Sequence, residues 1–245
     1  MNQLTLIALE NFPADGGMVY AETNLRNLIP EPLNALTAFL FMLLAIYWLY
    51  KLKGFSTRSV FLSVATYLLL IGSIGGTIYH GLRLYSVFIY LDWLPILLLS
   101  IMTSAYFWAK VLQRKIYAVG IIVLFVILRF ILREYLFEHL NLNGSTSLNY
   151  AIMVLTVFTP LLIYQVRTRF LRGQFIFFAI GCFSLALFFR IADSWKLLSV
   201  GTHFLWHFFG ALATQLMFRY IYYVDIGRVR MSPVSTYRPL KSQAS

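Results

Sequence analysis

The sequence predicts an all-α membrane protein with seven transmembrane helices, the N-terminus outside and the C-terminus in the cytoplasm. Hydrophobic residues make up 60% of its 245 residues and charged residues only 12%, and the mean hydropathy is +0.75. This composition is typical of chains that lipid surrounds. The hydrophobic residues occur in long runs, and a helix needs roughly 17 to 25 mostly apolar residues to cross a bilayer. Basic residues lie between alternate runs, which indicates an orientation.

Seven runs reach or approach this length, and short linkers join them. In chain order the expected spans are Leu33–Tyr50, Val60–Tyr79, Val87–Ala109, Tyr117–Leu132, Leu148–Val166, Phe175–Ile191 and Thr202–Tyr223. The fourth and the sixth are the shortest, so their ends are the least defined. No linker is long enough for a soluble domain. We therefore expect an N-terminal segment outside the membrane over 1–32, one membrane domain over 33–224 and a cytoplasmic tail over 225–245.

The net charge of +11 has the sign that attracts nucleic acid, but the positions of the basic residues favour a membrane instead. Basic clusters follow the first, third, fifth and seventh spans: Lys51, Lys53, Arg58; Lys110, Arg114, Lys115; Arg167, Arg169, Arg172; and Arg219, Arg228, Arg230, Arg238, Lys241. By the positive-inside rule these regions are cytoplasmic. We expect a multi-pass integral protein of a bacterial inner membrane or of the endoplasmic reticulum or Golgi, whose partner is the lipid bilayer and not nucleic acid.

Four ionisable side chains lie at the ends of these apolar spans. They are His80, Asp92, His203 and His207. An isolated charge in hydrocarbon costs roughly 2.5 to 3.5 kcal/mol even on lenient insertion scales, so such groups normally have a partner and a function. At a rise of about 1.5 Å per residue, the expected orientation brings all four within about 10 Å of one level in the outer half of the membrane. Three imidazoles and a carboxylate at one depth suggest a metal site.

The segment His203-Phe-Leu-Trp-His207 places two imidazoles four residues apart, on one face of a helix. Catalytic zinc typically takes three protein ligands and a water, and three neutral imidazoles are a well-attested set. His80 is the natural third ligand. The alternative is that these histidines form hydrogen bonds with neighbouring helices.

Asp92 allows two interpretations. As a functional group, it accepts a hydrogen bond from a metal-bound water or from a ligating histidine, orients the water and takes its proton. As a structural group, it pairs with Arg83 or Arg190 near the outer surface. His139 lies beside Glu138 in a polar stretch, where we expect a solvated loop histidine outside the site.

Three segments carry these residues: Gly76-Thr-Ile-Tyr-His80, Leu91-Asp92-Trp-Leu-Pro95 and Gly201-Thr-His203-Phe-Leu-Trp-His207. Together they resemble the alkaline ceramidase family, within the larger superfamily of seven-helix membrane hydrolases that includes the adiponectin-type receptors. The resemblance covers nearly the whole chain. It implies that the three histidines hold zinc and that Asp92 contacts the zinc-bound water.

The chain departs from this family at Gly76, where the family usually has a serine four residues before the first histidine. Ser73 and Thr77 lie near the same helical face as His80. Ser73 is our candidate for the hydroxyl of the site. The alternative for both residues is a hydrogen bond to their own helix backbone.

The N-terminal segment contains Glu22-Thr-Asn24 and Glu31-Pro-Leu-Asn34, which resemble the calcium loop of the ceramidases. Carboxylate and amide oxygens are hard ligands that suit calcium. The resemblance therefore implies a Ca²⁺ site at Glu22, Asn24 and Glu31. Val19 stands where the family has an aspartate, and the alternative is a solvated acidic segment.

The residues and the resemblance together predict a zinc-dependent amidohydrolase that cleaves a membrane lipid amide. The expected substrate is ceramide, and the expected products are a fatty acid and a sphingoid base. Zn²⁺ lowers the pKa of its water to about 7 and polarises the carbonyl, while Asp92 accepts a proton. Three alternatives stay open: a hydrolase of another lipid amide or ester, a receptor of the adiponectin type, and a proton-coupled transporter with a His and Asp relay.

Overall fold

The computed structural model describes residues 12–55, 58–112, 114–137 and 142–230, and these ranges contain helices and no strand. Residues 1–11 of the expected N-terminal segment, His139, and residues 231–245 of the expected tail lie outside the described residues. The long helices are α2 (Pro32–Leu52), α3 (Val60–Leu82), α4 (Val87–Val111), α5 (Lys115–Phe137), α6 (Leu142–Arg167), α7 (Gly173–Ala192) and α8 (His203–Asp225), with a 3₁₀ turn η1 (Asp193–Trp195) after α7. The seven expected spans fall on α2 to α8 in order.

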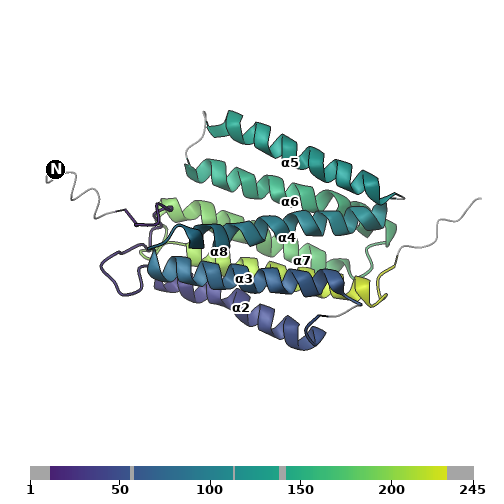
Figure 1. Cartoon of the computed structure of the whole chain (residues 1–245), viewed down its shortest axis with the longest axis horizontal. Coiled ribbons are helices and arrows are strands. Elements are labelled where there is room, and N and C mark those ends of the chain that lie inside the picture. Colours follow the sequence, from purple (N-terminus) through teal and green to yellow (C-terminus); the bar gives the residue numbers. More distant parts are fainter. Residues whose placement is uncertain (1–11, 56–57, 113, 138–141, 231–245) are drawn as a thin grey trace, which may run out of the picture.

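The helices run side by side along the long axis of the molecule (Figure 1). Short connections make consecutive helices antiparallel. α2 packs on α3, α3 on α4, α4 on α6 and α7 on α8, while α8 also packs on α2 and closes the bundle. α5 lies at the margin, where it contacts α4 and α6. This order places the start of α8 beside the end of α3.

Five of the helical segments are long and apolar enough to cross a membrane: α2, α3, α4, Asn149–Arg167 of α6, and Gly173–Trp195, which covers α7 and η1. This confirms the prediction of an all-helical chain with membrane-spanning character. Large apolar side chains such as Leu36, Ile71 and Phe177 are exposed on the outside of the bundle, where lipid would cover them. α8 is more polar, because it carries His203, His207, Gln215, Arg219 and Asp225.

Three glycines let α3 and α4 approach closely. A Cβ atom added at Gly75 would lie 2.3 Å from Leu91 Cβ, and one at Gly72 would lie 3.0 Å from Pro95 Cβ. At Gly76 the nearest atom would be Asp92 Oδ1, at 2.4 Å. Small residues commonly permit such approach between membrane helices. The glycines of α3 therefore bring the Asp92 carboxylate directly against the helix that ends at the first histidine.

Residues 12–31 fold over the end of the bundle where α3 ends and α8 begins. Both oxygens of the Glu22 carboxylate accept backbone N–H groups of the first turn of α2, from Leu33 at 2.5 Å and from Asn34 at 2.9 Å. These donors have no partner inside the helix, and a carboxylate also interacts favourably with the helix dipole. Glu22 therefore anchors the segment to α2.

Candidate metal centre

Three buried histidines meet at this end of the bundle, as the sequence predicts. His80 comes from the last turn of α3, and His203 and His207 from the first two turns of α8. One ligand atom from each residue lies within 4.8 Å of the others. The ring centroids are 5.4 Å apart for His80 and His203, 5.0 Å for His80 and His207, and 4.8 Å for His203 and His207. The three rings are therefore close enough to share one metal ion.

Each ring has one buried nitrogen that lacks a hydrogen-bond partner within the described part of the chain: His80 Nε2, His203 Nδ1 and His207 Nε2. A buried polar group without a partner costs roughly 1 to 3 kcal/mol by mutational measurement, so three would be a considerable penalty. Binding of a structural zinc ion is worth about 10 to 16 kcal/mol in small peptides at neutral pH, which exceeds that penalty. The donor set therefore fits a metal that accepts three imidazoles, and the alternative of histidines bonded to neighbouring helices does not account for these three atoms.

Glu31 orients the first of these histidines. Its Oε2 lies 2.5 Å from His80 Nδ1, and both side chains are fully buried. With Nδ1 as the donor to the carboxylate, Nε2 is left free for a metal, an arrangement found for most metal-bound histidines. Burial raises the pKa of Glu31, but the hydrogen bond and charge of His80 and the charge of Arg83 outweigh it, so the pKa lies below its usual value.

Asp193 fixes the backbone at His203, the second of these histidines. It belongs to η1, and its Oδ1 accepts backbone N–H groups at the start of α8, from Thr202 at 2.7 Å and from His203 at 3.0 Å. Its Oδ2 accepts the N–H of Ala21 at 3.0 Å. One carboxylate thus fixes the start of α8 and joins it to the N-terminal segment. The sequence offered a signal for Asp193, since it is an acidic residue two positions beyond the sixth expected span.

Tyr20 covers the outer side of the histidines. Its ring stacks on that of His203, with the centroids 3.9 Å apart and the planes at 27°, and lies 5.4 Å from that of His80. Tyr20 is itself buried. The Tyr20 ring therefore shields one face of the His203 imidazole, while the cavity that His207 lines lies in the bundle interior.

Asp92 faces that interior. Its carboxylate packs against Gly76 and lines the same cavity as His207. Within the described residues it forms no ion pair, and Arg83, one of its two expected structural partners, pairs instead with Asp15 and Glu31. The other, Arg190, lies over the rings of Tyr150 and Trp206. Asp92 therefore lies at the cavity wall with its Oδ1 against Gly76, and it also interacts electrostatically with Arg190.

Ser73 also lines this cavity, but its hydroxyl donates to its own helix, to the carbonyl of Leu70 at 2.8 Å. Thr77 does the same toward the Ser73 carbonyl, at 2.7 Å. Both hydroxyls therefore form the alternative named from the sequence, a hydrogen bond to their own helix backbone. A role of Ser73 in chemistry stays a prediction.

The residues predicted to hold calcium each have another partner. Glu22 accepts the two backbone N–H groups of α2, and Asn24 Oδ1 accepts the N–H of Arg26 at 3.1 Å. Burial raises the pKa of Glu22, although the two backbone donors lower it. Glu31 is buried against His80, and its other oxygen accepts the hydroxyl of Thr23 at 2.6 Å.

The cavity beside the centre has a volume of about 260 Å³ and is mostly apolar. Every long helix except α5 contributes to its wall, and the α8 residues that line it run from Trp206 to Ile221. His207 and Ile221 are fourteen residues apart on α8, which corresponds to roughly 21 Å along the helix. Ser100, Thr103 and Thr214 line the wall too, but their hydroxyls donate to their own helices. The cavity thus suits a long apolar chain whose polar end reaches Asp92 and His207.

No protein-family model matches this chain, and no curated protein matches it. The site and the fold therefore carry the functional argument by themselves.

Proposed function

We propose that this chain is a zinc-dependent hydrolase of a membrane lipid amide, with ceramide as the substrate and a fatty acid and a sphingoid base as products. One observation carries the proposal. Three buried imidazoles, each with an unpartnered nitrogen, lie beside a carboxylate at the polar end of a long apolar cavity. An acyl chain fits the apolar part, and the amide that joins it to the head group would then lie at the histidines and Asp92.

In this proposal zinc supplies a Lewis acid and a water of lowered pKa when it is bound to His80, His203 and His207. Asp92 accepts the proton of the attacking water from the cavity side, which is the work of a general base. Glu31 holds His80 in the orientation that leaves Nε2 free, and Tyr20 shields one face of the His203 ring. The cavity wall positions the acyl chain. The amide is thereby held next to the catalytic groups, which lowers the entropic cost of the reaction.

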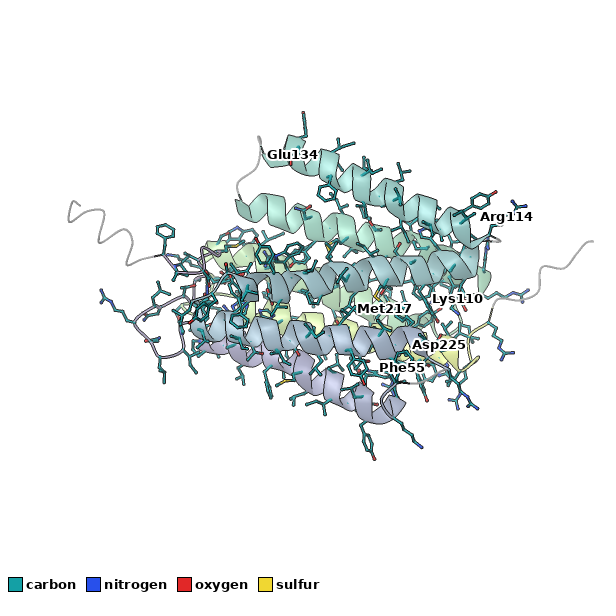
Figure 2. The ribbon with its side chains drawn as sticks, viewed as in Figure 1. Phe55, Lys110, Arg114, Glu134, Met217 and Asp225 are labelled. Carbon is teal, nitrogen blue, oxygen red and sulfur yellow. The ribbon has the colours of Figure 1, made fainter. Side chains whose placement is uncertain are left out.

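The proposed topology is seven spans with the metal centre toward the outside. Figure 2 shows Lys110 and Arg114 at one end of the bundle, and Figure 1 shows the N-terminal segment at the other. The histidines belong to that second end, where α3 finishes and α8 begins. Basic residues mark the cytoplasmic side of membrane proteins. In this topology the cavity receives a substrate that arrives from the bilayer, and the metal centre lies in the outer half of the membrane.

The first test is metal content together with turnover. Purified protein in detergent should carry about one zinc per chain by elemental analysis, and the His203→Ala and His207→Ala variants should lose most of it. The parent should release fatty acid from ceramide, and removal of zinc by a chelator should abolish this release until zinc is restored. Undiminished zinc in both variants would contradict the site. Stoichiometric zinc without hydrolysis of ceramide or of other lipid amides and esters would favour a receptor-like protein.

A further inference from the structure

Arg83 is a buried cation at the outer end of the bundle, between two carboxylates. It follows α3 in the left-handed conformation, with φ of 55°, and only 1% of it is exposed. Its Nε donates to Asp15 Oδ2 at 2.8 Å and its Nη2 to Asp15 Oδ1 at 3.2 Å. Its Nη1 donates to Glu31 Oε1, and Nη2 also reaches the Met18 carbonyl at 2.9 Å. The ring of Tyr79 lies 4.6 Å from the guanidinium carbon.

These contacts join three parts of the chain at one point. Asp15 and Met18 belong to the segment that covers the bundle end, Glu31 directly precedes α2, and Arg83 ends α3. The side chains of Arg83, Asp15 and Glu31 are all fully buried. Two buried carboxylates without a cation would repel each other and would lack the solvation that water gives them. The guanidinium supplies both the charge and the donors.

We propose that Arg83 is an internal cation that does here what a bound metal ion would otherwise do, so that the outer segment is fixed without calcium. Calcium takes six to eight oxygen ligands at about 2.3 to 2.6 Å. The oxygens of Glu31 already accept from Arg83, Thr23 and His80, and those of Glu22 from two backbone N–H groups. A calcium ion at Glu31 would have to displace the donors of this carboxylate and lie beside a buried positive charge.

Arg83 is also a positioning residue for the metal centre. It holds Glu31, which in turn holds His80 Nδ1, and it holds Asp15 and Met18, which lead to Tyr20 against His203. Partners that orient a metal-bound histidine typically change metal affinity by about 10- to 100-fold when removed. The effect on zinc rests on the proposed zinc site, whereas the effect on calcium does not.

The test compares Arg83→Met and Arg83→Lys with the parent and with Arg26→Met. Arg26 is an exposed arginine of the same segment, so its loss removes the same charge without touching the cluster. The melting temperature is followed during titration with calcium, with magnesium as the ionic control, and zinc affinity is measured by chelator competition. These readouts do not require turnover.

The parent and Arg26→Met should show no rise in melting temperature with calcium. Arg83→Met should melt lower, hold zinc about 10- to 100-fold more weakly, and gain stability with calcium in a saturable manner, because Asp15 and Glu31 are left without a cation. Arg83→Lys keeps the charge without the planar fork of donors, so its loss should be smaller and calcium should have no effect.

A rise in the melting temperature of the parent with calcium would overturn the proposal. So would an Arg83→Met protein that is destabilised but that calcium does not restore, since Arg83 would then be a structural residue alone. If Arg83→Met yields folded protein only when calcium is present, the proposal is supported; if it yields none in either condition, the parent titration and Arg83→Lys decide. Absence of zinc from the parent would contradict the proposed function and leave the calcium result valid.

Discussion

The free nitrogen of His80 and the surroundings of His203 and Asp92 depend on individual neighbours. Glu31 accepts a hydrogen bond from Nδ1 of His80, which leaves Nε2 without a partner among the described residues. Tyr20 stacks on His203 and shields one face of that ring. Asp92 reaches the cavity because position 76 has no side chain. The chemistry proposed for the site is thus set by contacts of one atom with another, and substitutions at these positions test it.

The Asp92→Asn variant retains the shape of the side chain and removes the proton acceptor. We expect zinc content near that of the parent and turnover of the lipid amide lower by about 10²- to 10⁴-fold. Zinc per chain, turnover per zinc and melting temperature, measured on one preparation, check this. A variant that melts lower but keeps its turnover per zinc would assign Asp92 a structural role.

The Gly76→Ala variant tests the position of that carboxylate. The added Cβ would lie 2.4 Å from Asp92 Oδ1, so the carboxylate has to move. A displacement of this kind can cost about 10²-fold in rate, and zinc content should be unchanged because no ligand is touched. Gly81→Ala is the matched control on the same helix, since a Cβ there meets no atom within 4 Å. If Gly76→Ala turned over substrate at the parental rate, catalysis would not depend on the present position of the Asp92 carboxylate.

At the scale of the elements, the centre depends on helix ends. The first turns of α2 and α8 have backbone N–H groups without partners inside the helix, and carboxylates from other parts of the chain accept them. Glu22 accepts two N–H groups of α2. Asp193 accepts two at the start of α8 and also the N–H of Ala21. The two helix starts are therefore tied to the segment that covers the histidines.

The Asp193→Ala variant removes the acceptor of three backbone N–H groups. Loss of a helix cap typically costs about 0.5 to 2 kcal/mol, and buried donors left without a partner raise this cost. We expect a lower melting temperature and weaker zinc binding, because His203 is the first residue of α8. Ser194→Ala is the control, since that exposed hydroxyl donates only to the Ile191 carbonyl. Equal melting temperatures for the two variants would contradict the role given to Asp193.

At the scale of the whole molecule, the two ends of the bundle differ in character. The end where α3 finishes and α8 begins carries the histidines beneath the N-terminal segment. The other end carries Lys110, Arg114 and Asp225 (Figure 2). Between them lies the apolar cavity, bounded by six helices. A lipid tail can extend toward the basic end while its polar group stays at the histidines.

Cysteine labelling tests this orientation. In a Cys182→Ser background, which removes the single native cysteine, the Arg26→Cys variant should react with a membrane-impermeant maleimide applied from outside. Arg58→Cys should react only after the membrane is permeabilised, because it follows the first span on the basic side. Both positions are exposed in the structure. Reaction of both from outside, or the reverse pattern, would contradict the proposed topology.

The order and approximate limits of the seven helices could be predicted from the sequence, because a run of apolar residues of bilayer length is a local property of the chain. The histidines could be found for a related reason. The spacing of His203 and His207 is local, and the expected orientation fixed the depth of His80. The structure confirms that these three lie together.

Asp193 was visible in the sequence as an acidic residue after the sixth span, but the contacts that hold the site could not be predicted, because they join separate segments of the chain. Glu31 lies 49 residues from His80, whose ring it orients, and Asp193 lies 10 residues from His203, whose backbone N–H it accepts. Asp15 lies 68 residues from Arg83. Calcium at Glu31 was implied by the resemblance to the ceramidase loop and stays a prediction, whereas the structure places this carboxylate against His80, Arg83 and Thr23. Only packing decides which cation or donor a carboxylate meets. By itself the sequence determined the helices and the three histidines that could hold a metal, through local hydrophobicity and spacing. The tertiary structure decided which nitrogen of His80 stays free and which carboxylate lines the cavity, since both depend on contacts between distant segments.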